Sequence, residues 1–179
     1  GSTLTQLETP SLALIEMDVE FHGKTAHAGI APYAGRSAVD AVTMLQTGLG
    51  LMRNHLKDSS RVSNIVLAGG TAVNSVPDIA KVKVEIRHSS MAYLESVEQW
   101  TREIAQAAAM ATQTQVQITP VAHIYNTTIN DAMGALLMEC AEKFACDGIA
   151  PPRKDCGSTD FGAVTHRLPS CCLRVKTIE

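Results

Sequence analysis

A histidine stands in a run of small residues, Gly23-Lys24-Thr25-Ala26-His27-Ala28-Gly29, in a segment that also holds Pro32 and Gly35. Because little bulk surrounds His27, its imidazole can stay exposed and reach a partner group. A neutral imidazole accepts or relays a proton, and a charged one stabilises a developing oxyanion. An isolated loop histidine more often bonds to backbone or caps a helix, and the residues alone favour that structural role.

A second polar stretch runs from Gly69 to Asp78 and leads into a segment that ends at Arg87. Asn74 offers an amide donor and acceptor from a loop, and Arg87 offers a planar guanidinium that suits a carboxylate. Asparagine is also common in turns, and Arg87 also continues the polar side of a strand. Both residues therefore fit a binding role and a structural role.

The third stretch is Gly157-Ser158-Thr159-Asp160-Phe161-Gly162, with His166 nearby. These residue types could form a nucleophilic triad, but triad members normally come from separate elements, and no G-x-S-x-G elbow is present. The hydroxyls of Ser158 and Thr159 and the adjacent N–H groups instead predict a substrate loop that holds an anion. The alternative is an aspartate-containing turn.

The spacing of the histidines and the number of cysteines argue against a zinc site and a disulfide framework. A catalytic zinc needs about three protein ligands, whereas the six histidines are scattered, with no H-x-x-x-H or H-x-H pattern. We therefore expect no metal and no other cofactor in this chain. The five cysteines are odd in number and contain no C-x-x-C pair, which indicates a reducing compartment and a cytoplasmic location.

The amino-acid composition limits the classes of protein to which the chain can belong. The 179 residues are 45% hydrophobic and 18% charged, as in a folded domain. The formal net charge is −3 and the basic residues are scattered singly, which argues against a nucleic-acid partner. No apolar run approaches the length of a membrane span, and no secretory signal is visible, so no membrane partner is expected.

Hydrophobic periodicity predicts the elements that would position these residues. Strands are predicted over residues 11–22, 61–68, 81–87 and 115–125, from apolar residues that alternate with polar ones. Helices are predicted over about 37–56, 92–112 and 130–145, the first opened by Ser37 with Asp40 in a variant of the capping box. Its apolar stripe is Val42, Leu45, Leu49, Met52 and Leu56. The stripe of the second helix is Leu94, Val97, Thr101, Ile104, Ala108 and Ala111.

The element order β-α-β-β-α-β predicts an α+β fold: a ferredoxin-like two-layer sandwich, with a four-stranded antiparallel sheet and helices on one face. An extra helix and a Gly-, Pro- and Cys-rich segment follow, so two regions are expected, 11–125 and 126–179. The strand over 61–68 exposes Val62, Ile65, Val66 and Leu67 beside a helix that ends in Leu51, Met52 and Leu56. Such an edge predicts a homodimer, because it invites pairing with its own copy.

Three strings strongly resemble the M20 family of metallopeptidases and amidohydrolases, in its branch of aminobenzoyl-glutamate hydrolases and β-alanyl-dipeptidases. They are VEFHGKTAHAGIAPYAGRSAVDAV, GGTAVNSVPDIAKVKVEIR and GSTDFGAV. The resemblance implies a lid and dimerisation domain plus a C-terminal piece of the zinc-binding catalytic domain. It implies that His27 polarises the scissile carbonyl in the partner subunit. It also implies that Asn74 and Arg87 contact the substrate, Arg87 through a carboxylate, and that Ser158 and Thr159 belong to the substrate loop.

The chain departs from the family pattern because the lid begins near residue 11 and most of the family's zinc ligands would precede it. Two functions follow as expectations. One is the lid and dimerisation part of a zinc-dependent amidohydrolase that cleaves amide bonds of acyl-amino acids or dipeptides, without hydrolytic activity in this chain alone. The other is a stand-alone, metal-free lid-like protein that acts as a catalyst through His27 or binds a small molecule.

Overall fold

The computed structural model describes residues 4–144, 148–152 and 157–177. These residues form two compact units. Unit 2 comprises Leu14–His88 and Ala92–His123, and unit 1 comprises the remaining described residues. Unit 2 holds the predicted sandwich, and each unit is described by itself below.

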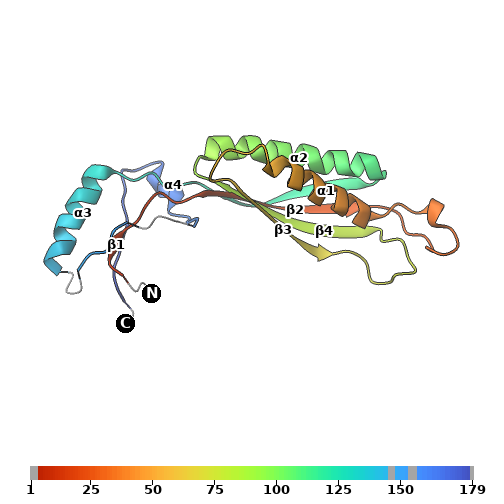
Figure 1. Ribbon diagram of the computed structural model, residues 1–179, viewed down its shortest axis with the longest axis horizontal. Coiled ribbons are helices and arrows are strands. Elements are labelled where there is room, and N and C mark those ends of the chain that lie inside the picture. The colour runs from red at the N-terminus through yellow and green to blue at the C-terminus, as the bar shows by residue number, and fades with distance from the viewer. Residues whose placement is uncertain (1–3, 145–147, 153–156, 178–179) are drawn as a thin grey trace. The chain divides into compact units, whose positions relative to one another are not determined.

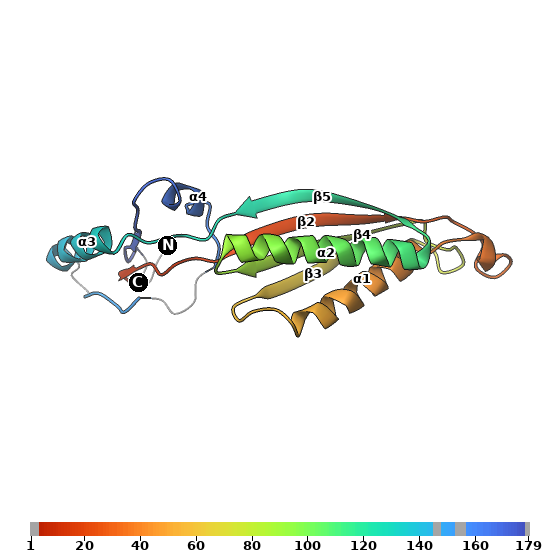
Figure 2. The same cartoon turned by 90° about the horizontal axis from the view of Figure 1, so that it is seen from above.

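Unit 2 is built on a four-stranded antiparallel sheet in the order β3-β4-β2-β5 (Figures 1 and 2). Its strands are β2 (Ala13–His22), β3 (Arg61–Ala68), β4 (Ile79–His88) and β5 (Gln115–Ile124). The order places β2 and β4, the first and third strands of the predicted pattern, in the centre of the sheet. The edge strands are β3 and β5. The ferredoxin-like α+β prediction is confirmed.

Two helices cover one face of this sheet, α1 (Ala38–Arg53) and α2 (Met91–Thr112) (Figure 2). Ser37 caps α1 as predicted, because its Oγ accepts a hydrogen bond of 3.2 Å from the backbone N–H of Asp40. The two helices approach closely at Gly48, where a Cβ atom would overlap Cγ2 of Ile104 on α2. The sheet and helices bury a shared apolar core. Its largest fully buried side chains include Ile15, Met17, Phe21, Leu45, Leu49, Val82, Val84, Ile86 and Leu94.

The predicted helical stripes are wrong at their ends. Leu56 lies beyond the last turn of α1 and is half-buried. On α2, Ile104 is half-buried beside Gly48 and Ala111 is exposed, whereas Ala105 and Ala109 are buried. The buried side of the 22-residue α2 drifts around its axis, because 3.6 residues per turn do not repeat in whole steps of three and four.

The register of β3 on β4 fixes which side chains share a face. Val62 pairs with Ile86 and Asn64 with Val84, so these β3 residues face the helices. Arg61, Ser63 and Ile65 pair with Arg87, Glu85 and Lys83 on the open face. The register shifts between Val66 and Ala68, which marks a bulge near the end of β3.

Unit 1 contains a two-stranded antiparallel sheet and two helices. The short strand β1 (Gln6–Leu7) pairs with β6 (Leu173–Arg174), and the helices are α3 (Asp131–Phe144) and α4 (Gly162–Thr165). The sequence patterns do not predict β1. Ser11 and Thr127 are both buried and exchange hydrogen bonds, each hydroxyl accepting from the other residue's N–H at 2.6 and 3.1 Å.

Among the described residues, no helix is both long enough and apolar enough to cross a membrane.

Candidate functional site

His27 lies in the loop that joins β2 to α1, at the end of the sheet where β2 finishes and β4 starts. The base of this loop is closed by Lys24 and Arg36, whose backbones exchange two hydrogen bonds of 2.8 Å. Between them the chain makes one short 3-10 turn, Pro32–Ala34. His27 is exposed. The loop therefore presents an imidazole to solvent from a closed backbone frame.

The ring of His27 has a defined hydrogen-bonding role. Its Nδ1 accepts a hydrogen bond of 3.2 Å from the backbone N–H of Gly29. In the neutral imidazole an accepting Nδ1 leaves the proton on Nε2. The outward nitrogen is then a donor, which is the form that can stabilise negative charge on a carbonyl oxygen.

Asn74 lies against the His27 loop. It belongs to the loop between β3 and β4, and its backbone oxygen accepts a hydrogen bond of 2.9 Å from the N–H of Ala28. His27 and Ser75 form a backbone bridge, and the Ser75 hydroxyl lies 2.9 Å from that of Thr25. The structure thus brings His27 and Asn74 together, although 47 positions separate them in the sequence.

Arg87 lies at the other end of the same sheet. Asp78, whose oxygen accepts a hydrogen bond from the N–H of Gly23, is at the start of β4, and Arg87 is at its end. Nine residues of strand span about 30 Å at 3.3 Å per residue. Arg87 binds Glu85 through two hydrogen bonds, Nε to Oε1 at 2.8 Å and Nη2 to Oε2 at 3.1 Å.

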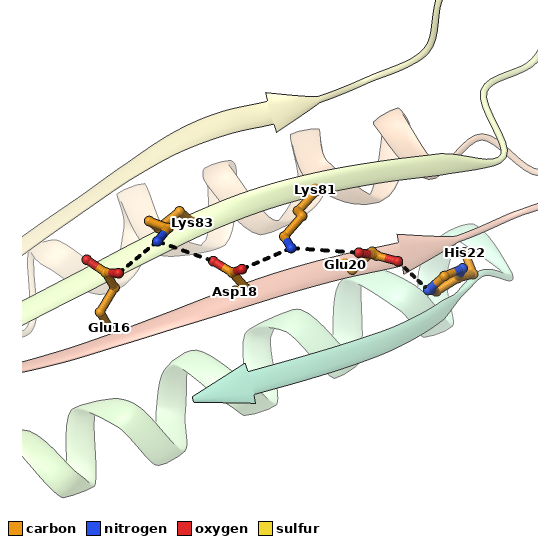
Figure 3. A network of polar contacts seen from close by, with 6 residues as sticks. All are labelled: Glu16, Asp18, Glu20, His22, Lys81 and Lys83. Atoms are coloured by element: carbon orange, nitrogen blue, oxygen red, sulfur yellow. Dashed lines mark hydrogen bonds and ion pairs between the residues drawn. The ribbon is translucent and has the colours of Figure 1, made fainter. Parts of the chain in front are cut away.

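The open face between these ends carries a ladder of alternating charges, drawn in Figure 3. Lys83 Nζ lies 2.8 Å from Glu16 Oε1 and 3.7 Å from Asp18 Oδ1. Lys81 Nζ lies 2.9 Å from Asp18 Oδ2, and His22 Nε2 lies 3.0 Å from Glu20 Oε1. The hydrogen bond to Glu16 is the largest cause that raises the pKa of Lys83 above its usual value. The ladder stabilises β2 against β4.

Ser158 and Thr159 lie in unit 1, directly before α4. Thr159 Oγ1 accepts a hydrogen bond of 3.3 Å from the N–H of Phe161, which is the bonding of a serine/threonine turn. A Cβ at Gly162 would collide with the backbone oxygen of Tyr125, so this turn packs tightly against the chain leaving β5. Both residues remain candidates for a substrate loop.

The described residues contain no group of three or more His, Cys, Asp or Glu side chains that could hold a metal ion. The side chains that the structure describes therefore do not fit the ligand set of a catalytic zinc, which needs about three. Burial, followed by the charge of Glu8, raises the pKa of the Cys172 thiol in unit 1.

Comparison with known proteins assigns the class of this fold. Residues 13–113 match the M20 family described as the peptidase dimerisation domain. The match covers more than half of the chain and includes β2, β3, β4 and both helices that cover the sheet. The chain belongs to the M20 peptidase dimerisation domain family.

Particular relatives agree with this assignment. The chain is 30% identical over 164 residues to a Xaa-Arg dipeptidase of Mus musculus, covering 89% of this chain and 38% of the relative. It is 33% identical over 130 residues to a subunit of the p-aminobenzoyl-glutamate hydrolase of Escherichia coli, covering 70% and 27%. It therefore spans well under half of the length of these relatives.

A solved structure extends the likeness beyond the family match. The aminobenzoyl-glutamate utilization protein of Klebsiella pneumoniae superposes with a TM-score of 0.78 and 25% identity. The superposition covers 93% of this chain and 44% of that one. The resemblance therefore reaches into unit 1 as well as the dimerisation domain.

Sequence patterns missed one residue that the sheet places beside the predicted site. Arg61, at the start of β3, lies directly opposite Arg87 in the β3–β4 register. Arg61 and Arg87 belong to consecutive strands but stand 26 positions apart, so their pairing shows only once the β3–β4 hairpin is in register. A hairpin alignment of the two predicted strands would have been the way to find it.

Proposed function

We propose that this chain forms the lid and dimerisation part of a zinc-dependent amidohydrolase of the M20 type. The enzyme cleaves amide bonds of acyl-amino acids or dipeptides. One observation carries the proposal: in a dimerisation domain, His27 and Asn74 lie at one end of a sheet and Arg87 at the other. A separation of about 30 Å is too long for one small substrate to bridge within one chain.

Pairing between two copies through β3 removes this difficulty. The sheet has two edges, β3 and β5. Pro120 lies within β5, and proline cannot donate a hydrogen bond to an added strand. No proline occurs in β3, which exposes Ile65, Val66 and Leu67 at 59%, 45% and 49%. An unblocked apolar edge favours pairing with a copy of itself.

The side of α1 next to β3 borders the same edge of the sheet. Gln46 Nε2 donates to Asn64 Oδ1 at 2.8 Å, and Arg53 Nη2 donates to the backbone oxygen of Val62 at 2.8 Å. Gly50, between them on this side, has open space around it. Leu51 and Met52 belong to other sides of α1, since Leu51 is five residues from Gln46 and Met52 is buried. The helix residues named in the sequence-based argument, Leu51, Met52 and Leu56, therefore stay a prediction.

A two-fold axis through β3 brings the two ends together. Antiparallel pairing of two β3 strands sets the Arg61 end of one beside the Ala68 end of the other. Arg87 pairs with Arg61, and the loop that carries Asn74 follows Ala68. Arg87 of one subunit and the partner subunit's His27 and Asn74 then share one end of an eight-stranded sheet.

Each residue of this composite site has a defined task. His27 donates from Nε2 to the carbonyl oxygen as negative charge develops on it, and Asn74 adds an amide donor. Arg87 holds the substrate carboxylate. That carboxylate replaces Glu85 as acceptor of the hydrogen bonds that Arg87 donates, or shares them with it. Ser158 and Thr159, which lie in unit 1, are proposed separately as the substrate loop. Zinc would polarise the carbonyl and supply hydroxide, and its ligands would lie outside the described residues.

Subunit mixing tests this proposal in the longer hydrolase that it implies. His27→Ala removes one oxyanion donor and should lower turnover by about two to three orders of magnitude. Arg87→Ala should also inactivate the homodimer. In a mixed dimer of the two variants, one site receives the intact His27 and the intact Arg87 from different subunits. Random exchange should therefore restore about a quarter of wild-type activity.

The control mixes His27→Ala with the double variant His27→Ala/Arg87→Ala, which restores no site. Native mass spectrometry verifies subunit exchange in both mixtures. If exchange occurs and the first mixture stays inactive, His27 and Arg87 do not act across the dimer. If the wild-type protein hydrolyses no acyl-amino acid or dipeptide, the assignment as an amidohydrolase is wrong.

A further inference from the structure

Two arginines face each other across the β3–β4 hairpin. Arg61 and Arg87 are direct partners in the antiparallel register, so both lie on the open face of the sheet. The Cβ atoms of such partners are about 4.5–5.5 Å apart, and like charges in direct opposition destabilise the pairing. A pair of this kind calls for a negative charge that compensates it.

Within the part of the chain that the structure describes, a carboxylate compensates one of the two guanidinium groups and not the other. Arg87 binds both carboxylate oxygens of Glu85. Arg61 Nη1 donates to the backbone oxygen of Ser60 at 2.8 Å, and within the described residues no carboxylate oxygen lies within ion-pair distance of Arg61. Arg61 is exposed and lines an open hollow of about 390 Å³.

The surroundings of this hollow are mainly basic. It is lined by the turn from α1 to β3, which contributes Arg53, Lys57 and Arg61 and a single acid, Asp58. Lys57 lies over the ring of Tyr93, 4.6 Å from its centroid. Counted together, the lining of the hollow and the neighbouring Arg87–Glu85 pair supply four cations, with Arg53 on the helix side among them, and two carboxylates. The local electrostatic field favours an anionic ligand and disfavours a cationic one.

We propose that Arg61 selects the amino acid of the substrate by binding a second carboxylate. The inference rests on the proposed function, in which Arg87 holds the α-carboxylate. The side-chain carboxylate of an aspartate or glutamate residue is separated from that α-carboxylate by only a short alkyl chain. Neighbouring guanidinium groups on one face can therefore bind both groups of one acidic residue. A basic amino acid in the same position is repelled.

Substrate comparison with Arg61→Gln tests this directly. The longer hydrolase is assayed with N-(4-aminobenzoyl) derivatives of glutamate, glutamine and arginine. Wild type should prefer glutamate to its neutral isostere glutamine. Arg61→Gln should lower kcat/KM for glutamate by about one to two orders of magnitude, because it removes a hydrogen bond between two charged groups. The kcat/KM for the glutamine derivative should be unaffected. For the glutamate derivative, the kcat/KM of Arg61→Lys should fall between those of wild type and Arg61→Gln.

Arg53→Gln is the matched control, because it removes the same charge at the same end of the sheet. Arg53 belongs to α1, which covers the helix face of the sheet, and its guanidinium donates to the backbone oxygen of Val62. It lines the same hollow as Arg61 but is anchored on the helix side. Its glutamate-to-glutamine ratio should stay near that of wild type. If Arg53→Gln and Arg61→Gln lower the ratio equally, the preference comes from the general field and Arg61 has no specific role.

A binding measurement separates this inference from the proposed function. The 179-residue chain is titrated with N-acetyl-glutamate and with N-acetyl-glutamine while the arginine Nε–H resonances are followed by NMR. A shift of the Arg61 resonance with the glutamate derivative alone supports the inference even if no substrate is hydrolysed. Equal responses to both compounds, or none, overturn it. If the enzyme hydrolyses these substrates and the ratio of kcat/KM for glutamate to that for glutamine is unchanged in Arg61→Gln, the role of Arg61 is overturned. The amidohydrolase assignment then remains intact.

Discussion

Gly23 packs directly against the backbone carbonyl of Arg36, where the loop that carries His27 leaves and rejoins the sandwich. A Cβ atom at position 23 would collide with that oxygen and crowd the N–H of Ala38. The N–H of Gly23 also donates to the oxygen of Asp78 at 2.7 Å. Two loops and the start of α1 therefore meet at a point where only glycine fits.

Gly23→Ala should lower the free energy of unfolding by about 1–3 kcal/mol, because rigid backbone atoms must move to admit the methyl group. Denaturant unfolding measures the change. Gly29→Ala is the control in the same loop, since a Cβ there meets only the His27 ring at 3.6 Å, an ordinary contact. That variant should stay within about 0.5 kcal/mol of wild type. Equal stability of the two variants would contradict the close packing at Gly23.

Dimerisation through β3 predicts opposite results for two edge valines. Val66 on β3 and Val121 on β5 are 45% and 47% exposed. Lysine in an edge strand blocks strand addition. Val66→Lys should therefore shift the mass measured by light scattering at micromolar concentration from twice 19.1 kDa toward 19.1 kDa. Val121→Lys should remain dimeric. Dissociation by Val121→Lys alone would place the interface at β5.

Lys83 predicts a loss of stability at alkaline pH. The hydrogen bond to Glu16 and the charges of Glu16 and Asp18 raise its pKa above the ordinary value of 10.5. The folded protein therefore binds this proton more tightly than the unfolded chain does. The contribution of protonated Lys83 to the free energy of unfolding is complete below pH 10.5. It disappears as the pH rises through the pKa of Lys83 in the folded state.

Lys83→Met should be less stable than wild type at about pH 8, and the difference should shrink as the pH rises beyond 10.5. Denaturant unfolding at several pH values gives this difference, in which the titration of other groups cancels. The same comparison in a Glu16→Gln background should show a weaker dependence on pH, because the main acceptor has lost its charge. A difference that is constant up to about pH 12 would show that the ion pair is not the cause.

The local patterns of the sequence determined the secondary structure of unit 2. Alternation with a period of two marks β4, where Val82, Val84 and Ile86 are all buried. The Ser37 cap predicts the start of α1 because a side-chain hydroxyl and an N–H three residues later are close in any helix. The order of these elements indicated the ferredoxin-like fold, since the right-handed crossover rule leaves few other arrangements.

The tertiary structure alone decided which distant residues meet. The pairing of Gln6 with Arg174 joins two-residue strands, which are too short to leave a periodic signal. The contact of Asn74 with the His27 loop and the register of Arg61 on Arg87 depend on alignment between segments that are separate in the sequence. A one-residue slip would send every side chain of a strand to the other face. The types of residue proposed for the site were therefore readable from the sequence, whereas the positions of His27 and Arg87 at opposite ends of one sheet follow from the register of the folded sheet. The proposed dimer rests on those positions and on the exposed edge strand β3.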